Sequence, residues 1–575
     1  MRNFINIVIL AVLMVGPLAA AIQQPVQVAG GLLSGVPGKD ASVLTFQGIP
    51  FAAPPVGDWR WREPQPVLAW QGVRRADKFS AGCIQRMVSE RKPWTYEFMT
   101  HGEISEDCLY LNVWTSAASA GEKRPVFVYI YGGGFSEGSA QVPVYDGEGL
   151  AKKGLVVVTF NYRVGVLGFL VHPALAVESA HHVSGNHGML DQVAALQWVH
   201  DNIAAFGGDP NRVTIAGQLA GGISVHDLTA SPLAKGLFQR AIVESGGSSI
   251  GGMKLGPQTM AEAEAQGQEF AKARGVKSLA ELRAMSWEKL MEPLPSDTPG
   301  GGLPRLFFAP IPHGYFLPAP FVEVIAQGKQ NDVVTLTGAN KDELGGFGPP
   351  QGPVTAESFA KQARQRYGEA AEEFLKLYPA QTDEEAKMAQ SQSTRDQALV
   401  SMYLWAKLRA KTAKTKVCEY LWDHAMPGPD AARFGAFHTS EVPYVMNTLY
   451  MSDRRSPRQT GTSPARCPPT GRILPPPEIR MEKVFLTGQP SAMNRKSWRW
   501  ATRWRPSQSR AAPRSLRFSK TISLSEDKKR GTRLLNPFRR KCGGKPGVSH
   551  LFLSSSWVGR RSMRRPMIRS RLRRA

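Results

Sequence analysis

The stretch that most constrains the fold is Val213–Gly222, where an apolar, β-branched run enters a turn flanked by glycines. β-Branched residues favour a strand, and Ala220-Gly221-Gly222-Ile223 leads into what we expect to be a helix. Gly217 and Gly221 allow the strand and the helix to approach closely, which holds the side chain between them out of the turn in a strained backbone state. The stretch therefore predicts a sharp strand-to-helix turn with Leu219 at its tip.

Short apolar runs recur along the chain and predict an α/β fold. Their hydrophobicity is continuous, which indicates strands of a mostly parallel sheet that is covered on both faces. We expect these strands at Leu109–Trp114, Pro125–Ile130, Leu155–Phe160, Val213–Ala216, Val333–Thr337 and Val417–Trp422. An amphipathic helix that covers the sheet is predicted by apolar residues spaced by four and three at Met189, Val193, Leu196, Val199 and Ile203.

Helical patterns dominate residues 250–330 and 350–416, and we expect them to form a lid region over the strand ends. Examples are Ala261–Ala273, Ala356–Leu377 and Gln397–Lys411. The length of 575 residues would allow several domains, but large α/β enzymes often run this long as one unit.

The turn and its surroundings resemble the type-B carboxylesterase and cholinesterase family of α/β-hydrolases. A Gly-x-x-x-Gly spacing alone fits any tight strand-to-helix turn, but further motifs of that family surround it. They are Phe206-Gly207-Gly208-Asp209-Pro210, Ser231-Pro232-Leu233, Gly236-Leu237-Phe238, Gly185-Asn186 and Trp198-Val199. The resemblance implies the α/β-hydrolase fold, a large mostly parallel central sheet with helices on both faces and a helical lid region. It also implies hydrolysis of a small carboxylic ester through an acyl-enzyme, with no cofactor and no metal.

Two residues of the turn depart from the family, in which it usually reads Gly-Glu-Ser-Ala-Gly and carries the nucleophilic serine. Gln218 replaces the glutamate, which we expect to be tolerated, and Leu219 replaces the serine. A leucine has no lone pair with which to attack, and it fills the volume where the scissile carbonyl has to lie. Ser224 lies about one and a half helical turns further on and does not easily replace the hydroxyl. We therefore expect negligible esterase activity, and a non-catalytic binding protein of the same fold is the alternative.

The resemblance assigns the oxyanion hole to Gly133 and Gly134, with the backbone N–H of Ala220 as the third donor. The two glycines lie in Tyr131-Gly132-Gly133-Gly134-Phe135, directly after a predicted strand. Bare backbone N–H groups in such a loop can donate to a developing negative oxygen. A plain glycine turn is the alternative interpretation.

The acid and the base of the site are also implied by the resemblance. Glu343, in Gly338-Ala339-Asn340-Lys341-Asp342-Glu343, is the triad carboxylate, and the neighbouring Asp342 is the competing choice. His438 is the base, since a neutral imidazole can take a proton from a hydroxyl and return it to the leaving group. The order of turn, acid and histidine is that of α/β-hydrolases. Ser245 is expected to support the acid and not to replace the nucleophile.

Five cysteines are present, and the resemblance implies a disulfide between Cys83 and Cys108. It would close a surface loop that carries Trp94, which either contacts the substrate or simply packs in the loop. Closing a loop of this length should stabilise the fold by about 3 kcal/mol in the chain-entropy model.

The first 21 residues are typical of a secretory signal peptide. Arg2 precedes an apolar run from Phe4 to Leu18, and Ala19-Ala20-Ala21 then provides a cleavage site. So short an apolar run suits cleavage better than a membrane span, although a retained anchor is the alternative. We expect a periplasmic or secreted protein, in a compartment where disulfides persist.

The charge of the chain is concentrated in residues 454–575, which hold 25 Arg and 7 Lys against 4 acidic residues. The formal net charge of +24 thus belongs to this tail, and the family resemblance ends at about residue 453. We expect three parts, namely the signal peptide (1–21), the carboxylesterase domain (22–453) and a disordered basic tail (454–575). The tail is interpreted as a frameshift product, and polyanion binding is the alternative, with no specific nucleic acid expected as a partner.

Overall fold

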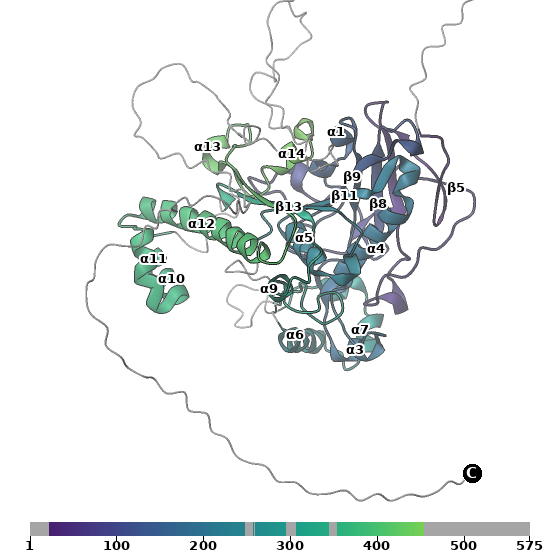
Figure 1. Cartoon of the computed structure of the whole chain (residues 1–575). Coiled ribbons are helices and arrows are strands. Elements are labelled where there is room, and N and C mark those ends of the chain that lie inside the picture. Colours follow the sequence, from purple (N-terminus) through teal and green to yellow (C-terminus); the bar gives the residue numbers. More distant parts are fainter. Residues whose placement is uncertain (1–21, 248–256, 258, 295–305, 344–353, 453–575) are drawn as a thin grey trace, which may run out of the picture. The chain divides into compact units, whose positions relative to one another are not determined.

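The computed structural model describes residues 22–247, 257, 259–294, 306–343 and 354–452. The expectations for the signal peptide and for the basic tail concern residues outside these ranges. The described residues are built on a nine-stranded sheet (Figure 1). In spatial order its strands are β14 (Val417–Trp422), β13 (Val334–Asn340), β12 (Arg240–Glu244), β11 (Gly208–Gln218), β9 (Arg124–Ile130), β10 (Val156–Phe160), β8 (Tyr110–Thr115), β4 (Leu44–Pro50) and β3 (Val36–Pro37).

The strands from β14 to β10 are parallel, and the remaining three are antiparallel at one edge. The predicted mostly parallel sheet is therefore confirmed, and all six predicted strands are present. β11 begins at Gly208 and is longer than expected. Smaller sheets contain β1 (Val26–Val28), β2 (Gly31–Ser34) and β5 (Val73–Arg75), and β6 (Gly82–Cys83) with β7 (Ile104–Ser105).

Three strands of the large sheet were missed by the sequence analysis, namely β12, β4 and the two-residue edge strand β3. The apolar part of β12 is only Ala241-Ile242-Val243, which is too short to stand out from its polar neighbours. β4 has Gln47-Gly48 in its middle, and its pairing with β8 shifts register between Phe46 and Ile49. A bulge of this kind breaks the run of hydrophobic residues by which a strand is recognised.

Helices cover both faces of the sheet (Figure 1). The α-helices are α1 (Glu148–Ala151), α2 (Gly165–Phe169), α3 (Pro173–Glu178), α4 (His187–Asn202), α5 (Ala220–Ala230), α6 (Met260–Ala273), α7 (Leu279–Ala284), α8 (Trp287–Met291), α9 (Phe321–Ala326), α10 (Ala356–Tyr367), α11 (Ala371–Leu377), α12 (Asp383–Arg409), α13 (Ala431–Phe434) and α14 (Val442–Val445). On one face, α4, α5, α9 and α12 pack against alternate strand residues such as Val128 and Ile215. On the other face, α1 and α14 pack against Phe127 and Tyr129.

The helices that we expected to form a lid have different boundaries from those predicted. The pattern at 356–377 is interrupted at Gly368, whose φ of +53° ends α10 before α11 begins. The pattern at 397–411 is the last part of the longer α12, whose first turn is capped by Thr382 and Glu385. Its C-terminal half lies on the sheet itself, because Trp405 and Ala406 are buried in the main core. The first half packs with α10 in a separate small core around Phe359 and Ala386.

The disulfide between Cys83 and Cys108 is present, with a Cα–Cα distance of 5.0 Å, as the family resemblance implied. It closes a surface loop that carries Trp94, and this residue is buried, with 8% of its surface exposed. Cys418 carries a free thiol in the described part of the chain. Among the helices of the described residues, none combines the length and the apolar character that crossing a bilayer requires.

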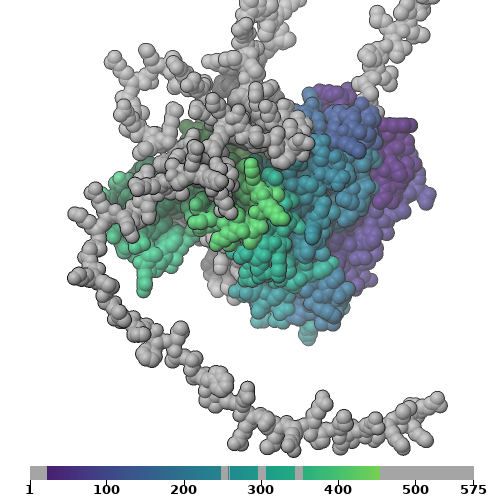
Figure 2. All heavy atoms as spheres, viewed as in Figure 1, coloured from purple at the N-terminus to yellow at the C-terminus, as the bar shows by residue number. Residues whose placement is uncertain are grey.

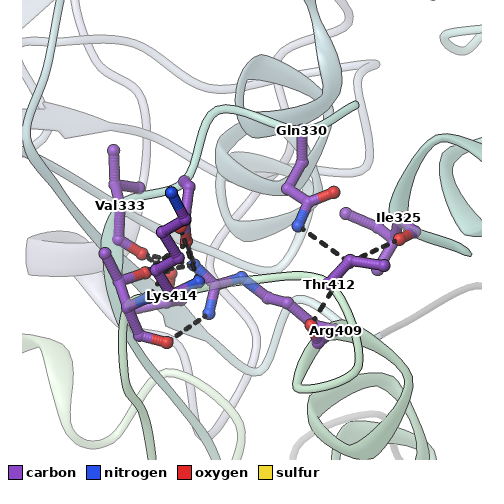
Figure 3. A network of polar contacts seen from close by, with 9 residues as sticks. Ile325, Gln330, Val333, Arg409, Thr412 and Lys414 are labelled. Carbon is purple, nitrogen blue, oxygen red and sulfur yellow. Dashed lines mark hydrogen bonds and ion pairs between the residues drawn. The ribbon is translucent and has the colours of Figure 1, made fainter. Parts of the chain in front are cut away.

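Arg409, at the end of α12, joins this helix to the sheet through a polar network around its buried side chain (Figure 3). Its guanidinium is 3% exposed and donates to the Asp332 carboxylate (3.0 Å) and to the Val333 carbonyl (2.7 Å). It also donates to the hydroxyl of Thr415 (2.6 Å). The backbone N–H of Lys414 donates to the other oxygen of Asp332 (2.7 Å). A single cation thus fixes the chain segments before β13 and β14.

Arg409→Ala is expected to lower the free energy of unfolding by about 2 kcal/mol, because it removes one charged donor of the partly exposed Asp332 carboxylate and the guanidinium donor of the Val333 carbonyl. Urea denaturation measures the change. Lys414→Ala is the matched control, since Lys414 enters the network through its backbone only, and it should change the stability by less than about 0.5 kcal/mol. Equal losses in the two variants would contradict this role of the guanidinium.

α5 carries two adjacent buried side chains, His226 and Asp227, whose pKa values are shifted by burial in opposite directions. Burial among Phe321 and Trp405, whose ring centroids lie 4.9 and 4.7 Å away, lowers the pKa of His226 to about 3. Burial raises the pKa of the Asp227 carboxyl to about 8. Both groups are therefore neutral in the folded protein near pH 7, where the unfolded chain would ionise Asp227.

Asp227→Asn is expected to stabilise the protein increasingly as the pH rises from 4 to 8. In the unfolded chain the carboxyl loses its proton near its ordinary pKa of 3.8, whereas in the folded protein it keeps the proton up to about pH 8. The wild-type chain therefore loses about 1.4 kcal/mol of stability per pH unit over this interval, and the amide does not. Thermal unfolding at pH 4.5 and 8 checks this. Asp201→Asn on α4 is the control, because water already solvates that carboxylate.

Candidate active site

The predicted sharp turn lies between β11 and α5, with Leu219 as the single residue between them. Its φ of 53° and ψ of −114° are rare for a residue with a side chain and mark stored backbone strain. The N–H of Leu219 donates to the Glu244 carbonyl (2.9 Å), and its own carbonyl accepts from Ile223 N–H (2.8 Å). A Cβ at Gly221 would lie 2.0 Å from the Ile130 carbonyl oxygen. Glycine is required there because α5 crosses the neighbouring strand backbone directly.

The glycine loop after β9 lies against the tip of this turn. A Cβ on Gly132 would lie 3.4 Å from the Cβ of Leu219, so the loop backbone passes beside position 219. Gly133 and Gly134 have φ values of +105° and +62°. A Cβ at Gly133 would lie 2.2 Å from the Glu137 carbonyl oxygen, which excludes any larger residue. The Leu219 side chain therefore lies between this loop and the first N–H of α5, that of Ala220.

His438 and Glu343, which the family resemblance named as base and acid, lie in contact. Nδ1 of the imidazole lies 2.5 Å from Oε2 of Glu343, and His438 is 4% exposed. The other oxygen, Oε1, accepts from the hydroxyl of Ser245 (2.7 Å) and from the Asn340 N–H (2.8 Å). Ser245 thus donates to the acid, and it follows Glu244, whose carbonyl accepts from the Leu219 N–H at the turn.

Glu343 remains ionised in this buried setting. Burial works against the charged carboxylate, but the charge of His438 and the hydrogen bonds from His438, Ser245 and the Asn340 N–H together lower the pKa of Glu343. An ionised carboxylate accepts hydrogen bonds only. It therefore accepts a hydrogen bond from Nδ1 of His438 and fixes the orientation of the imidazole.

Asp342, the competing choice for the acid, has a different task. Its backbone N–H donates to the Ala436 carbonyl (3.0 Å), which lies in the loop that carries His438. Its carboxylate accepts from the Ala436 N–H (2.9 Å). A Cβ at Gly435 would lie 2.2 Å from this carboxylate, so the loop closes tightly over Asp342. Asp342 fixes the loop, and Glu343 contacts the imidazole.

Several contacts at this site were not predicted from the sequence. The Gln218 side-chain nitrogen lies 2.9 Å from Nε2 and 3.3 Å from Nδ1 of His438, over the imidazole ring. Behind the pair, burial raises the pKa of Glu244 to about 8, and burial with the charge of Glu244 does the same to Glu441. The Trp94 indole N–H donates to the Thr439 hydroxyl (2.8 Å) beside His438. The available signal for Glu244 and Glu441 was position alone, since Glu244 directly precedes Ser245 and Glu441 lies three residues after His438.

Ser224, the nearest serine along α5, faces away from this chemistry. Its hydroxyl accepts from the Gln192 amide (3.0 Å) and donates to the Met189 sulfur (3.8 Å), both on α4. The arrangement thus combines a histidine–carboxylate pair that can move a proton with a strained turn whose tip bears no nucleophile.

Comparison with known proteins agrees with this fold. Residues 23–462 match the model of the carboxylesterase family. The chain is 38% identical over 444 residues to fumonisin B1 esterase of Sphingopyxis macrogoltabida, covering 75% of this chain and 77% of that protein. It is 34% identical over 418 residues to para-nitrobenzyl esterase of Bacillus subtilis, covering 71% and 80%.

A solved structure of PNB esterase superposes with a TM-score of 0.62 at 32% identity, over 75% of this chain and 85% of that chain. The fold is therefore that of the α/β-hydrolases. With the family match across most of its length, the chain belongs to the carboxylesterase family, whose members are carboxylic-ester hydrolases.

Proposed function

We propose that this chain is a carboxylesterase whose hydrolysis of small carboxylic esters is blocked at position 219. In this proposal Glu343 and His438 are the acid and the base, and Gly133, Gly134 and Ala220 donate to the oxyanion. The relatives named for esterase activity support an ester as the substrate class. What carries the proposal is the place of Leu219, at the strained tip of the turn and against the glycine loop.

The chemistry of the block follows from the side chain. An acyl-enzyme requires an oxygen or sulfur at position 219 that gives its proton to His438 and attacks the carbonyl carbon. An isobutyl group has no such atom, and its volume competes with the substrate carbonyl for the space beside the oxyanion donors. The histidine–carboxylate pair and the donors would then bind and polarise an ester without forming a bond to it.

Leu219→Ser is expected to raise turnover of p-nitrophenyl acetate by about 10³-fold over the unmodified chain, because the loss of the nucleophile is among the largest single losses in such enzymes. Steady-state hydrolysis at pH 7.5 measures the change. Leu219→Ala is the matched control, since it removes the bulk without adding a hydroxyl and should stay near the background rate.

Adding His438→Gln to the serine variant should return it to that background. Equal rates for the unmodified chain and for Leu219→Ser would show that position 219 is not the place of the nucleophile.

We also propose that the chain is exported and cleaved after Ala21, and that residues 22–453 form the hydrolase domain. The Cys83–Cys108 disulfide supports an oxidising compartment, since such bonds are rare in the cytosol. Expression in a bacterium with residues 1–21 attached should give a periplasmic protein whose intact mass corresponds to a chain that begins at Ile22. Recovery of uncleaved protein from the cytosol would contradict export.

A further inference from the structure

A pocket with a volume of about 370 Å³ lies between two loops of the described chain. One wall is formed within residues 90–97, in the loop that the Cys83–Cys108 disulfide closes. The other is formed within residues 426–437, which include α13 and belong to the light green part of the chain in Figure 2. This volume is in the range of small-molecule sites. The described lining does not include Leu219, so the pocket is distinct from the candidate active site.

The described lining of the pocket combines carboxylates with aromatic rings. Glu90, Glu97 and Asp430 supply the acidic groups, and Lys92 lies with its Nζ 2.7 Å from the Asp430 carboxylate. The aromatic rings are those of Tyr96, Phe434 and Phe437. A guanidinium is planar, donates to carboxylates and stacks on aromatic rings, so it suits both parts of this lining.

Glu97 is the most buried of these acidic residues, with 3% of its surface exposed. Its carboxylate accepts hydrogen bonds from the hydroxyls of Thr95 (2.6 Å) and Ser452 (2.8 Å). A carboxylate away from water is costly to keep charged, and a cation beside it lowers that cost. The buried end of the lining therefore favours a positive ligand.

The contact between Ser452 and Glu97 also fixes where the described chain ends. Ser452 is the last residue described and is 4% exposed, and the sequence continues as Asp453-Arg454-Arg455-Ser456-Pro457-Arg458. Because one residue spans at most about 3.6 Å, the Cα atoms of Arg454 and Arg455 lie within about 7 and 11 Å of that of Ser452. The basic tail thus begins with two arginines next to an acidic and aromatic pocket.

We propose that this pocket is a guanidinium site and that its occupant is the chain's own segment 453–458, through Arg454 or Arg455. Charge complementarity and the place where the described chain ends both favour this segment. The bound arginine joins the disulfide-closed loop to the loop that ends at His438. The site does not depend on residue 219, so its test is independent of esterase activity.

Arginine-selective labelling of the unmodified full-length chain tests the occupancy. Phenylglyoxal reacts with accessible guanidinium groups, and peptide mass spectrometry gives the rate at each arginine. Arg454 or Arg455 should react about 10-fold more slowly than Arg495 and Arg505 of the same tail, because a charge-assisted and stacked contact withholds the group from the reagent. Equal rates at all four arginines would overturn the proposal.

Variants of the pocket show whether its acidic groups cause the protection. Glu97→Gln should raise the rate of the protected arginine to that of Arg495. Glu90→Gln, at an exposed position that tolerates the change, should raise it about 3-fold, as expected for an exposed ion pair. Glu103→Gln is the matched control, since Glu103 is an exposed residue of the same disulfide loop outside the described lining, and it should change nothing. If Glu97→Gln does not fold, Glu90→Gln decides, and a rate equal to that of the control would contradict the site.

Agmatine, a free guanidinium compound, separates the chain's own segment from a separate cation. By titration calorimetry it should bind the unmodified chain about 10-fold more weakly than the double variant Arg454→Gln/Arg455→Gln, because the segment competes for the pocket. Equal affinities for the two chains would show that the pocket takes a separate cation and would overturn the assignment to this segment. No binding to the double variant would overturn the guanidinium site itself.

Discussion

The site depends on a backbone contact that only glycine allows. At the start of α5, a Cβ on Gly221 would lie 2.0 Å from the Ile130 carbonyl oxygen, and one on Gly222 would lie 2.8 Å from the Gly246 Cα. Because the helix crosses its neighbours without side chains between them, the residue before it is forced into a strained conformation and projects from the turn. The geometry holds position 219 in place regardless of the side chain there, so a leucine can occupy it without loss of the turn.

The parallel strands explain why distant residues meet at this turn. The carboxyl ends of neighbouring parallel strands lie along one edge of a sheet, which is where α/β proteins place their ligands. β11 ends at Gln218, β12 at Glu244 and β13 at Asn340. The residues just beyond these ends, namely Leu219, Ser245 and Glu343, therefore lie together, and the loop that carries His438 closes over them through Asp342. The spacing of the chain segments is set by hydrogen bonds of the sheet and not by the site.

Much of the architecture was predictable, because six strands are continuous apolar runs and α4 has a clear helical period. β12 and β4 were missed because one is very short and the other has a bulge, and sequence patterns identify only regular, well-populated elements. The sequence analysis also did not predict the break between helices at Gly368 or the packing of the C-terminal half of α12 on the sheet. Each depends on a local conformation or a packing partner far away in the chain.

The sequence by itself determined that a glycine-flanked strand-to-helix turn exists, that it carries leucine, and that acid and histidine motifs follow in hydrolase order. These are properties of residue type and spacing, so they can be read without coordinates. Only the tertiary structure decided that Glu343 rather than Asp342 contacts the imidazole and that the Gln218 amide lies 2.9 Å from its other nitrogen. These contacts join residues 95 and 220 positions apart in the chain. They depend on how strands pair and on side-chain torsions, and neither is encoded in a local pattern.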